Sequence, residues 1–509
     1  MQEQLPSAYL FITPWYAQRT LRLKIGTSRR HVGKLFLAAS LTALDRGFGG
    51  AAGEFEFVQG KRLDYPFLFC RDKRKPYQLV QELLTQHRNK EFRMRSLDPA
   101  WVRSRFPALS QEIDGRIPVF FDGPGGSQVP GSVIEAMARY LIFSNANAHG
   151  AFASSRRTDK CIASARKAAA DLLGCEPYEV VFGANMTTLT FALSRAIGRE
   201  LNPGDEILVT RLDHYANVSP WKALEEEAGA VVRVADIHPE DCTLDLENLK
   251  RKINAKTRVV AIGYASNAVG TVNDVAAVVR LAHAVGAWVF VDAVHYAAHG
   301  PIDAYALDCD FLACSAYKFY GPHVGVLYGK QQHLTRLRPC KVLPAPDEIP
   351  SRWETGTLNH ESLAGLTATV DYLAELGQQI SPSPSRRGAL VAALEASRRY
   401  ERALCAQLMA GLSKIPGLTV YGITDPARFA WRTPTVAVRL AGKKPDTVAK
   451  ELGDRGIYTW HGNFYAPGLT EKLNVEADGG FLRIGLLAYN TSDEIERLLR
   501  ALREITVEG

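Results

Sequence analysis

Short apolar, β-branched runs alternate with longer amphipathic segments over the middle of the chain, from about residue 117 to residue 386. Each run is apolar almost throughout, which is typical of strands that are covered on both faces of a sheet. The alternation of such runs with helix-like segments predicts an α/β domain with a mostly parallel sheet. The seven predicted strands are Val180–Phe182, Glu206–Thr210, Val231–Ala235, Val259–Tyr264, Trp288–Asp292, Phe311–Ser315 and Val324–Tyr328, and the helices between them are Thr187–Ile197, Ser219–Glu227, Leu246–Ile253 and Val275–Val285.

The pattern changes after the helix-breaking stretch S-P-S-P-S at residues 381–385. A long helical segment follows from about Gly388 to Leu412, and then come four short β-like runs and a closing amphipathic helix from Asp493 to Arg503. Such a series predicts a smaller α+β domain. We therefore place a large domain at residues 117–386, and a small domain at residues 97–116 together with 387–509.

Residues 1–96 differ from the rest of the chain in charge and in pattern. They carry 17 Lys and Arg residues against 8 Asp and Glu residues, while the remaining chain carries 44 against 46. Their apolar patches, Leu35–Leu44 and Tyr65–Phe69, lack sustained periodicity. Met94 directly precedes a helical start that Asp98 could cap. Two interpretations stay open: a poorly ordered basic extension, or a mis-assigned start of translation upstream of Met94.

Composition narrows the classes of function. The net charge of +7 comes from residues 1–96, so the main body offers no electrostatic basis for binding nucleic acid. No apolar run reaches the ~18 residues that a membrane-spanning helix needs. The eight cysteines form no C-x-x-C pair, which argues against a zinc site or a disulfide framework, and we interpret them as reduced thiols of a cytoplasmic protein. Binding of nucleic acid or of a membrane surface by residues 1–96 is kept as an alternative.

Polar side chains follow several predicted strands, at the sheet edge where open α/β folds bind ligands. G-A-N-M-T-T after the first strand could present N–H groups to a phosphate, although simple capping by Thr187 also explains the pattern. Taken singly, His214 and Asn267 are a surface-loop histidine and a turn asparagine. Asp292 ends an apolar strand, and Lys318 lies inside the apolar, aromatic run S-A-Y-K-F-Y-G-P. Charges at such positions are costly to bury unless they are paired or neutralised.

One ligand requires all of these groups, and that ligand is pyridoxal 5′-phosphate (PLP). Its aldehyde takes a lysine as a Schiff base, which would remove the cost of a buried Lys318 ammonium. Its ring nitrogen requires a carboxylate, for which Asp292 is suitably placed, and its phosphate requires a nest of N–H groups. The sequence therefore predicts a PLP-dependent enzyme.

Taken in order, the motifs resemble those of class V aminotransferase-fold enzymes, most closely the cysteine desulfurase and selenocysteine lyase branch. D-H-Y-A-N-V-S-P-W resembles E-H-H-A-N-x-x-P-W of that branch, V-D-A-V-H resembles D-x-A-Q, and S-A-Y-K-F-Y-G-P resembles S-G-H-K-x-x-G-P. The stretches A-S-N-A-V-G, W-E-T-G-T-L-N and F-L-R-I-G-L-L-A-Y-N-T also have counterparts there. The resemblance spans about residues 117 to 503. It implies the PLP-dependent transferase fold type I, with a mixed, mostly parallel seven-stranded sheet, and a homodimer with shared active sites.

The resemblance also implies a role for each matching residue. Lys318 would form the Schiff base and move the proton at Cα, Asp292 would hold the proton of the ring nitrogen, and His214 would stack on the ring. Arg483 would bind the substrate carboxylate through two hydrogen bonds. The other expected cofactor contacts are Met186, Thr187 and Ser315 at the phosphate, Tyr317 where the family has a phosphate-binding His, Asn267 and His295 at the phenolic oxygen, and Thr357 at the phosphate of the partner subunit.

The resemblance fails in G-I-Y-T-W-H-G-N-F-Y-A-P-G, residues 456–468. Desulfurases carry a cysteine in this loop whose thiolate becomes a persulfide, whereas here Tyr465 stands near that position and Trp460 near a basic one. No cysteine occurs between Cys405 and Gly509. A tyrosine cannot hold a transferable sulfur, so we expect Tyr465 to contact the amino-acid substrate and persulfide chemistry to be absent. The alternatives left open are an amino-acid lyase, an epimerase, an aminotransferase, a desulfurase-like activity without the loop nucleophile, or a catalytically idle PLP-binding homologue.

Overall fold

The computed structural model describes residues 23–27, 35–39, 55–58, 67–70 and 95–507. The chain divides into two compact units, residues 1–94 and 95–509, and each is described by itself.

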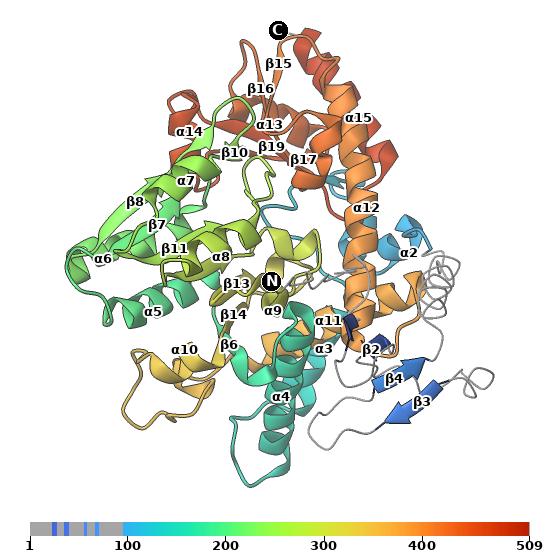
Figure 1. The fold of residues 1–509 in the computed structure, drawn as a ribbon. Coiled ribbons are helices and arrows are strands. Elements are labelled where there is room, and N and C mark those ends of the chain that lie inside the picture. Colours follow the sequence, from blue (N-terminus) through green and yellow to red (C-terminus); the bar gives the residue numbers. More distant parts are fainter. Residues whose placement is uncertain (1–22, 28–34, 40–54, 59–66, 71–94, 508–509) are drawn as a thin grey trace. The chain divides into compact units, whose positions relative to one another are not determined.

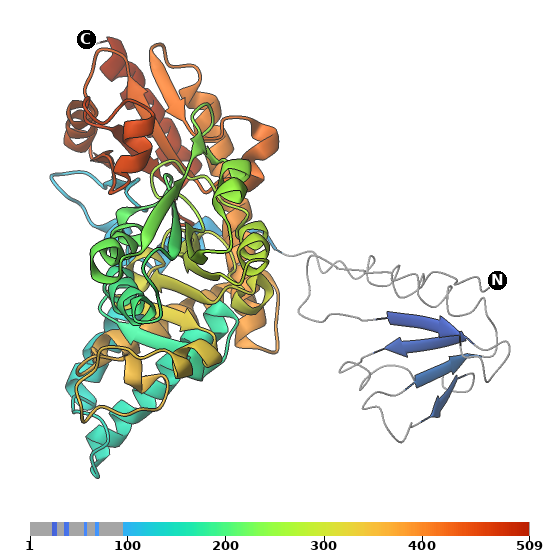
Figure 2. The same cartoon turned by 60° about the vertical axis from the view of Figure 1, so that its left-hand side comes forward.

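The first unit contains four strands in one antiparallel sheet, in the order β1-β2-β4-β3 (Figure 2). Two of these strands coincide with the apolar patches at residues 35–44 and 65–69, which the sequence pattern did not assign to a sheet. The patches were not assigned because they lie among Arg and Lys residues and do not alternate with helix-like segments, as the apolar runs of the large domain do. Met94, at which the alternative start was predicted, lies outside the described residues. The strands are β1 (Leu23–Thr27), β2 (Leu35–Ala39), β3 (Phe55–Val58) and β4 (Phe67–Cys70).

A seven-stranded sheet forms the centre of the second unit, with the order β6-β14-β13-β12-β11-β7-β8 (Figure 1). Only β14 runs antiparallel to its neighbours, so the predicted mixed, mostly parallel sheet is confirmed. β6, β7, β11, β12 and β13 therefore all end at the same edge. The strands are β6 (Val180–Gly183), β7 (Glu206–Thr210), β8 (Val231–Ala235), β11 (Thr257–Gly263), β12 (Trp288–Asp292), β13 (Phe311–Ser315) and β14 (Gly325–Gly329).

Helices between these strands bury the sheet as the apolar runs require. Leu193 of α5 (Met186–Gly198) and Trp221 of α6 (Ser219–Ala228) are fully buried in one core with Phe290 of β12. The Trp221 and Phe290 rings meet edge to face, with centroids 5.5 Å apart. The other two predicted helices are α7 (Leu246–Lys252) and α8 (Val275–His283), and α8 lies against β11 and β12.

A second, antiparallel sheet, β15-β16-β19-β18, belongs to a separate hydrophobic core. Val119 and Phe121 are buried in that core, and β5 (Val119–Phe120) pairs with β17 (Ile457–Tyr458). Residues 119–121 therefore contribute to the smaller core, although the sequence prediction grouped them with the large domain. The strands are β15 (Leu418–Tyr421), β16 (Thr435–Leu440), β18 (Trp460–Gly462) and β19 (Phe481–Gly485), and the helices of this part are α13 (Pro445–Asp454), α14 (Pro467–Lys472) and α15 (Ser492–Val507).

Long helices join the two cores. Helix α11 packs against three others, and α12 contributes Leu404 and Leu408 to the smaller core. These helices are α3 (Gly131–Phe143), α4 (Ala153–Leu173), α11 (His360–Ile380) and α12 (Arg386–Leu412), and the short α2 (Pro99–Ser104), α9 (Ala304–Leu307) and α10 (Gln331–Arg336) complete the described helices. Within the described part of the chain, every helix is too short or too polar to span a membrane.

Candidate active site

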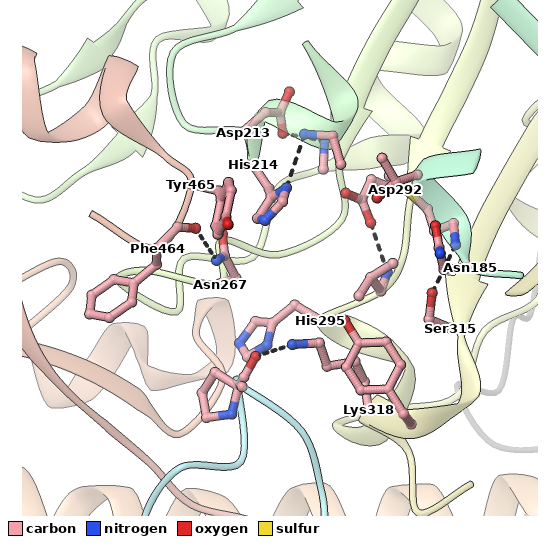
Figure 3. A pocket seen from close by; sticks show the side chains of 18 of the residues that line it. Asn185, Asp213, His214, Asn267, Asp292, His295, Ser315, Lys318, Phe464 and Tyr465 are labelled. Carbon is pink, nitrogen blue, oxygen red and sulfur yellow. Dashed lines mark hydrogen bonds between the residues drawn. The ribbon is translucent and has the colours of Figure 1, made fainter. Parts of the chain in front are cut away.

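A cavity of about 900 Å³ lies at the edge where β6, β7, β11, β12 and β13 end, and β18, β19 and the loop after β18 contribute further walls (Figure 3). Eleven of the residues that the sequence singled out line it together. Thr357 does not: it is exposed in the loop that precedes α11. The eleven are Met186, Thr187, His214, Asn267, Asp292, His295, Ser315, Tyr317, Lys318, Tyr465 and Arg483.

Lys318 follows β13 at the end of a short 3-10 helix. Its ammonium donates a hydrogen bond to the carbonyl oxygen of Pro124. Burial, reinforced by the charge of Arg483, lowers the pKa of Lys318 to about 7, against the opposing effect of Asp292 and Asp122. About half of the amines are therefore neutral at neutral pH, and a neutral amine can act as a nucleophile or as a base.

Asp292 is the last residue of β12, and its register partner on β11 is Gly263. Its Oδ1 accepts a hydrogen bond of 2.9 Å from the backbone N–H of Val294. Burial raises the pKa of Asp292 to about 6, although the Val294 hydrogen bond and the charge of Lys318 act in the opposite direction. A carboxylate at a strand end with an 8 % exposed side chain requires a positive partner from the cavity.

The N-terminus of α5 opens into the same cavity. Its cap is Asn185 rather than Thr187: Asn185 Oδ1 accepts a hydrogen bond of 3.0 Å from the N–H of Thr188. The backbone N–H of Met186 donates to Ser315 Oγ over 2.9 Å, so α5 is joined to the end of β13. The Met186 side chain is buried in the core, which leaves only backbone atoms of this residue for a ligand. A helix N-terminus with hydroxyl groups beside it suits a phosphate.

His214 follows β7 and caps its own turn, because its Nδ1 accepts a 3.0 Å hydrogen bond from the N–H of Ala216. This bond leaves the ring proton on Nε2 when the ring is neutral. Burial, together with the charges of Lys318 and Arg483, lowers the pKa of His214 to about 4. The neutral ring stacks on Tyr465 with centroids 5.3 Å apart.

Asn267 and His295, the expected partners of the phenolic oxygen, are both engaged by protein atoms. Asn267 Nδ2 donates to the carbonyl oxygen of Phe464 over 2.9 Å, so only its Oδ1 is free of that bond. His295 Nε2 lies 3.1 Å from Thr433 Oγ1 and 3.0 Å from Thr435 Oγ1. Burial holds the pKa of His295 well below its usual range, and the ring is neutral.

Arg483 lies in β19 and is 5 % exposed. One of its guanidinium nitrogens donates to the backbone oxygen of Asn267 over 3.0 Å, and the guanidinium carbon lies 4.0 Å above the centre of the Phe464 ring. Its Nε is buried and has no hydrogen-bond partner, and no carboxylate among the described residues lies within ion-pair distance of it. Burial lowers the pKa of Arg483 to about 9, so the group remains a cation with free donors, which suits a carboxylate ligand.

The loop after β18 holds the residues in which the desulfurase pattern fails. Phe464 and Tyr465 both adopt positive φ angles, 55° and 58°. The backbone oxygen of Tyr465 accepts a 2.7 Å hydrogen bond from the N–H of Tyr215, and its side chain is 73 % exposed. Asn463 completes the turn, since its Oδ1 accepts from the N–H of Tyr465 over 3.1 Å.

Sequence reasoning missed the D-G-P-G-G-S loop at residues 122–127 and the buried acid Asp213. Pro124 and Gly125 line the cavity, and a Cβ atom at Gly485 would lie 2.0 Å from Pro124 Cδ, so this loop is pressed against β19. Burial raises the pKa of Asp122 to about 6. The dense glycines directly after the apolar run V-F-F could have indicated a close backbone approach. His323, which stacks on Tyr317, gave no comparable signal.

The donor set of the cavity fits pyridoxal 5′-phosphate. Four groups face one space: a lysine with a lowered pKa, a buried strand-end carboxyl group, a helix N-terminus and a neutral histidine ring. Each corresponds to one functional group of that cofactor. The orphaned donor of Arg483 fits the carboxylate of an amino acid.

Comparison with known proteins leads to the same family. Residues 119–498 match the model of the aminotransferase class-V family. A cysteine desulfurase of Serratia proteamaculans is 32 % identical over 420 residues, which cover 79 % of this chain and 97 % of the relative. A probable cysteine desulfurase of Synechocystis is 32 % identical over 419 residues, which cover 79 % of this chain and 94 % of the relative.

Two solved structures have the same fold. The apo cysteine desulfurase of Thermococcus onnurineus NA1 gives a TM-score of 0.72 at 26 % identity, over 82 % of this chain and 99 % of that one. The S-sulfonic acid form of a cysteine desulfurase from Escherichia coli gives 0.69 at 28 % identity, over 81 % and 99 % of the two chains. The predicted fold type I is thereby confirmed, and the chain belongs to the aminotransferase class-V family of pyridoxal-phosphate-dependent, cysteine desulfurase-like enzymes.

Proposed function

We propose that this enzyme acts through Lys318 on an amino acid with a free α-carboxylate, and that it does so without a loop persulfide. PLP supplies an electron sink for the Cα atom of a bound amino acid. The observation that carries the proposal is the arrangement of two groups on one cavity: the amine of Lys318, whose pKa burial lowers to about 7, and the unpaired guanidinium of Arg483.

In this proposal Arg483 binds the substrate carboxylate through the donors that the protein leaves free. Lys318, when neutral, takes the proton from Cα and returns it, and Pro124 holds the amine by its carbonyl oxygen. Asp292 holds a proton at the ring nitrogen, the start of α5 binds the phosphate, and His214 covers one face of the ring. His295, Asn267 and Tyr317 contribute the remaining contacts.

The absence of persulfide chemistry is supported by the composition of the cavity wall. Tyr465 lies near the loop position at which the resemblance expects the desulfurase cysteine, and no cysteine among residues 95–507 lines the cavity. The relatives are named cysteine desulfurases, so a desulfurase-like substrate remains within the proposal. The outcome at Cα can be that of a lyase, an epimerase or an aminotransferase.

The deciding experiment is a spectral and product screen of the purified holoenzyme against D- and L-amino acids, including cysteine and its sulfinate. We expect a visible cofactor band that borohydride fixes onto Lys318. Substrates should change this band and give a product without any thiol-bound sulfur on the protein. A colourless protein that rejects added PLP would overturn the assignment as a PLP enzyme. A protein persulfide detected after cysteine turnover would overturn the proposal that the enzyme acts without a loop persulfide.

We also propose a cytoplasmic homodimer with shared active sites. The helix α3 and the turn after it expose an apolar group, made of Ile134, Leu141, Ile142, Phe143 and Phe152, each at least half exposed. Such a patch suits a protein interface. Thr357 precedes α11, which packs against α3, so the residue expected to reach the partner's phosphate lies near this patch. Ile142→Glu should convert a dimer to monomers in light-scattering measurements, and a wild-type monomer would contradict the proposal.

The cytoplasmic location rests on the thiols. The seven cysteines in residues 95–507 form no disulfide bonds, which fits a reducing compartment.

A further inference from the structure

Asp213 is a buried acid that the proposed chemistry does not use. It lies between β7 and the turn that begins at His214, its side chain is 4 % exposed, and it lines the cavity (Figure 3). Its Oδ1 accepts a 2.6 Å hydrogen bond from the N–H of Gly263. Its Oδ2 is buried without a well-formed hydrogen bond from the described residues, although the hydroxyl and the backbone of Thr210 face the carboxyl group. A buried oxygen without a well-formed hydrogen bond is costly, and it requires an explanation.

Asp213 is next to a second buried carboxyl group. Gly263, to which it bonds, is the register partner of Asp292 on the neighbouring strand. A Cβ atom at Gly263 would lie 2.5 Å from Asp213 Oδ1, so only a glycine allows the carboxyl group to come this close to the strand. Asp213 follows β7 and Asp292 ends β12, so the two acids flank the end of β11, at which Gly263 lies, on one wall of the cavity.

The positive charges that line the cavity are too few to stabilise both Asp213 and Asp292 in the ionised form. The cations that line the cavity are Lys318, whose amine is about half neutral at pH 7, and Arg483. His214 and His295 are neutral, because burial lowers the pKa of both rings. The third acid near these cations, Asp122, lies close enough to interact with Lys318 and Arg483 itself.

Two buried carboxyl groups that interact electrostatically are unfavourable when both are ionised, so one of them is expected to keep its proton. The environments of the two acids differ, and this difference determines which of the two carboxyl groups stays protonated. Burial and the charge of Asp292 raise the pKa of Asp213 to about 8, while the pKa of Asp292 rises only to about 6 because Lys318 opposes the effect of burial.

We propose that Asp213 is a positioning residue that carries the proton of this acid pair and leaves Asp292 as the single negative charge on that wall of the cavity. As a neutral acid, Asp213 accepts from Gly263 through Oδ1 and has a hydroxyl donor at Oδ2. The inference rests on the role proposed for Asp292 at the cofactor ring. Because Asp213 stays protonated, only one carboxylate of the pair is ionised.

The test is a pair of substitutions that separate a neutral acid from an ionised one. Asp213→Asn keeps an acceptor for Gly263 and puts an amide donor at the Oδ2 position, so it reproduces the neutral acid. Asp213→Leu has a similar volume but neither group. In the purified holoenzyme, we expect the Asn variant to retain PLP with a dissociation constant close to that of the wild type and an unchanged pH profile of the visible band. The Leu variant should shift that profile, and Asp292→Asn should lose cofactor.

A second measurement needs no cofactor chemistry. A carboxyl group with a folded-state pKa of about 8 and an unfolded-state value of 3.8 binds more protons when folded between these pH values. Its contribution to stability therefore falls as pH rises through this window. The melting temperature of Asp213→Asn should rise relative to wild type between pH 5 and pH 8, as the pKa of about 8 requires. The control is Asp347→Asn, whose side chain is 82 % exposed, and it should show no such trend.

Three outcomes would overturn the inference. These are cofactor loss in Asp213→Asn as complete as in Asp292→Asn, a melting-temperature difference that does not grow with pH, and an Asn variant that fails to fold, since the amide keeps the hydrogen bond from Gly263 and carries no charge. A wild-type protein that binds no PLP would contradict the proposed function instead, and the melting-temperature measurement would still decide the state of Asp213.

Discussion

The edge of the seven-stranded sheet and the loop of residues 460–465 enclose one cavity, but they are built differently. At the sheet edge, Asp292 is the last residue of β12 and Lys318 ends the single 3-10 turn after β13, so the pairing of these strands fixes the backbone positions of both residues. The loop is held by separate hydrogen bonds from Tyr215 and Asn267, and it includes two consecutive residues with positive φ. The sheet edge keeps the groups that a PLP cofactor needs, and the loop is where this chain departs from desulfurases. Under the proposed function, the first region would hold the cofactor, and the second would influence what happens to the substrate.

The largest effect should come from the sheet edge. Lys318→Ala removes both the cofactor anchor and the base, and we expect turnover to fall by at least about 10⁴-fold. Turnover and the visible band should both disappear. Lys450→Ala serves as the control because its side chain is 78 % exposed. Turnover near the wild-type level in the Lys318 variant would show that the sheet edge does not supply the cofactor chemistry.

Arg483 joins the two regions, since it lies in β19 and stacks on Phe464 of the loop. Arg483→Lys keeps the charge but loses the bidentate geometry, and we expect kcat/KM for an amino acid to fall by about 100-fold, or ~3 kcal/mol. Most of the change should appear in KM. Amino-acid amides, which lack the carboxylate, should be affected much less, and an equal loss for both substrates would contradict the role of Arg483.

The pH dependence of cofactor loading reports on the sheet edge alone. Only the neutral amine of Lys318 reacts, and its pKa is lowered to about 7. The rate at which cofactor-free protein takes up PLP should therefore rise about tenfold between pH 6 and pH 8 and then level off. A rate that keeps rising toward pH 10.5, the ordinary lysine value, would show that burial does not shift this amine.

The smallest effect should come from the loop. Phe464→Leu removes the ring under the Arg483 guanidinium, and such a contact is worth ~1 kcal/mol. We expect carboxylate inhibitors to bind about fivefold more weakly, with little change in cofactor affinity. Phe464→Tyr keeps a ring at this position and should bind these inhibitors like wild type. A loss of cofactor in the Leu variant would show that the two regions are not separable.

Local sequence predicted the sheet edge well because each residue there directly follows an apolar run. Lys318, Asp292 and His214 could be placed at one edge from strand order alone, and the structure brings them to one cavity. The contacts missed were those between distant segments. Pro124 meets Lys318 across 194 residues, and His295 meets Thr435 across 140. Neither pairing has a local signature. The antiparallel sheet of the first unit was missed because its apolar patches do not alternate with helix-like segments, which was the pattern that revealed the large domain.

Asn267 has a consequence for anyone who would engineer this enzyme. Its backbone oxygen accepts a hydrogen bond from the Arg483 guanidinium, and its side-chain amide donates one to the Phe464 carbonyl oxygen. This one residue therefore connects the proposed carboxylate-binding arginine to the loop. A thiol installed by Tyr465→Cys would lie on a turn that these two hydrogen bonds hold in place. An engineered loop that has to move would therefore need a change at Asn267 as well as the new side chain at residue 465.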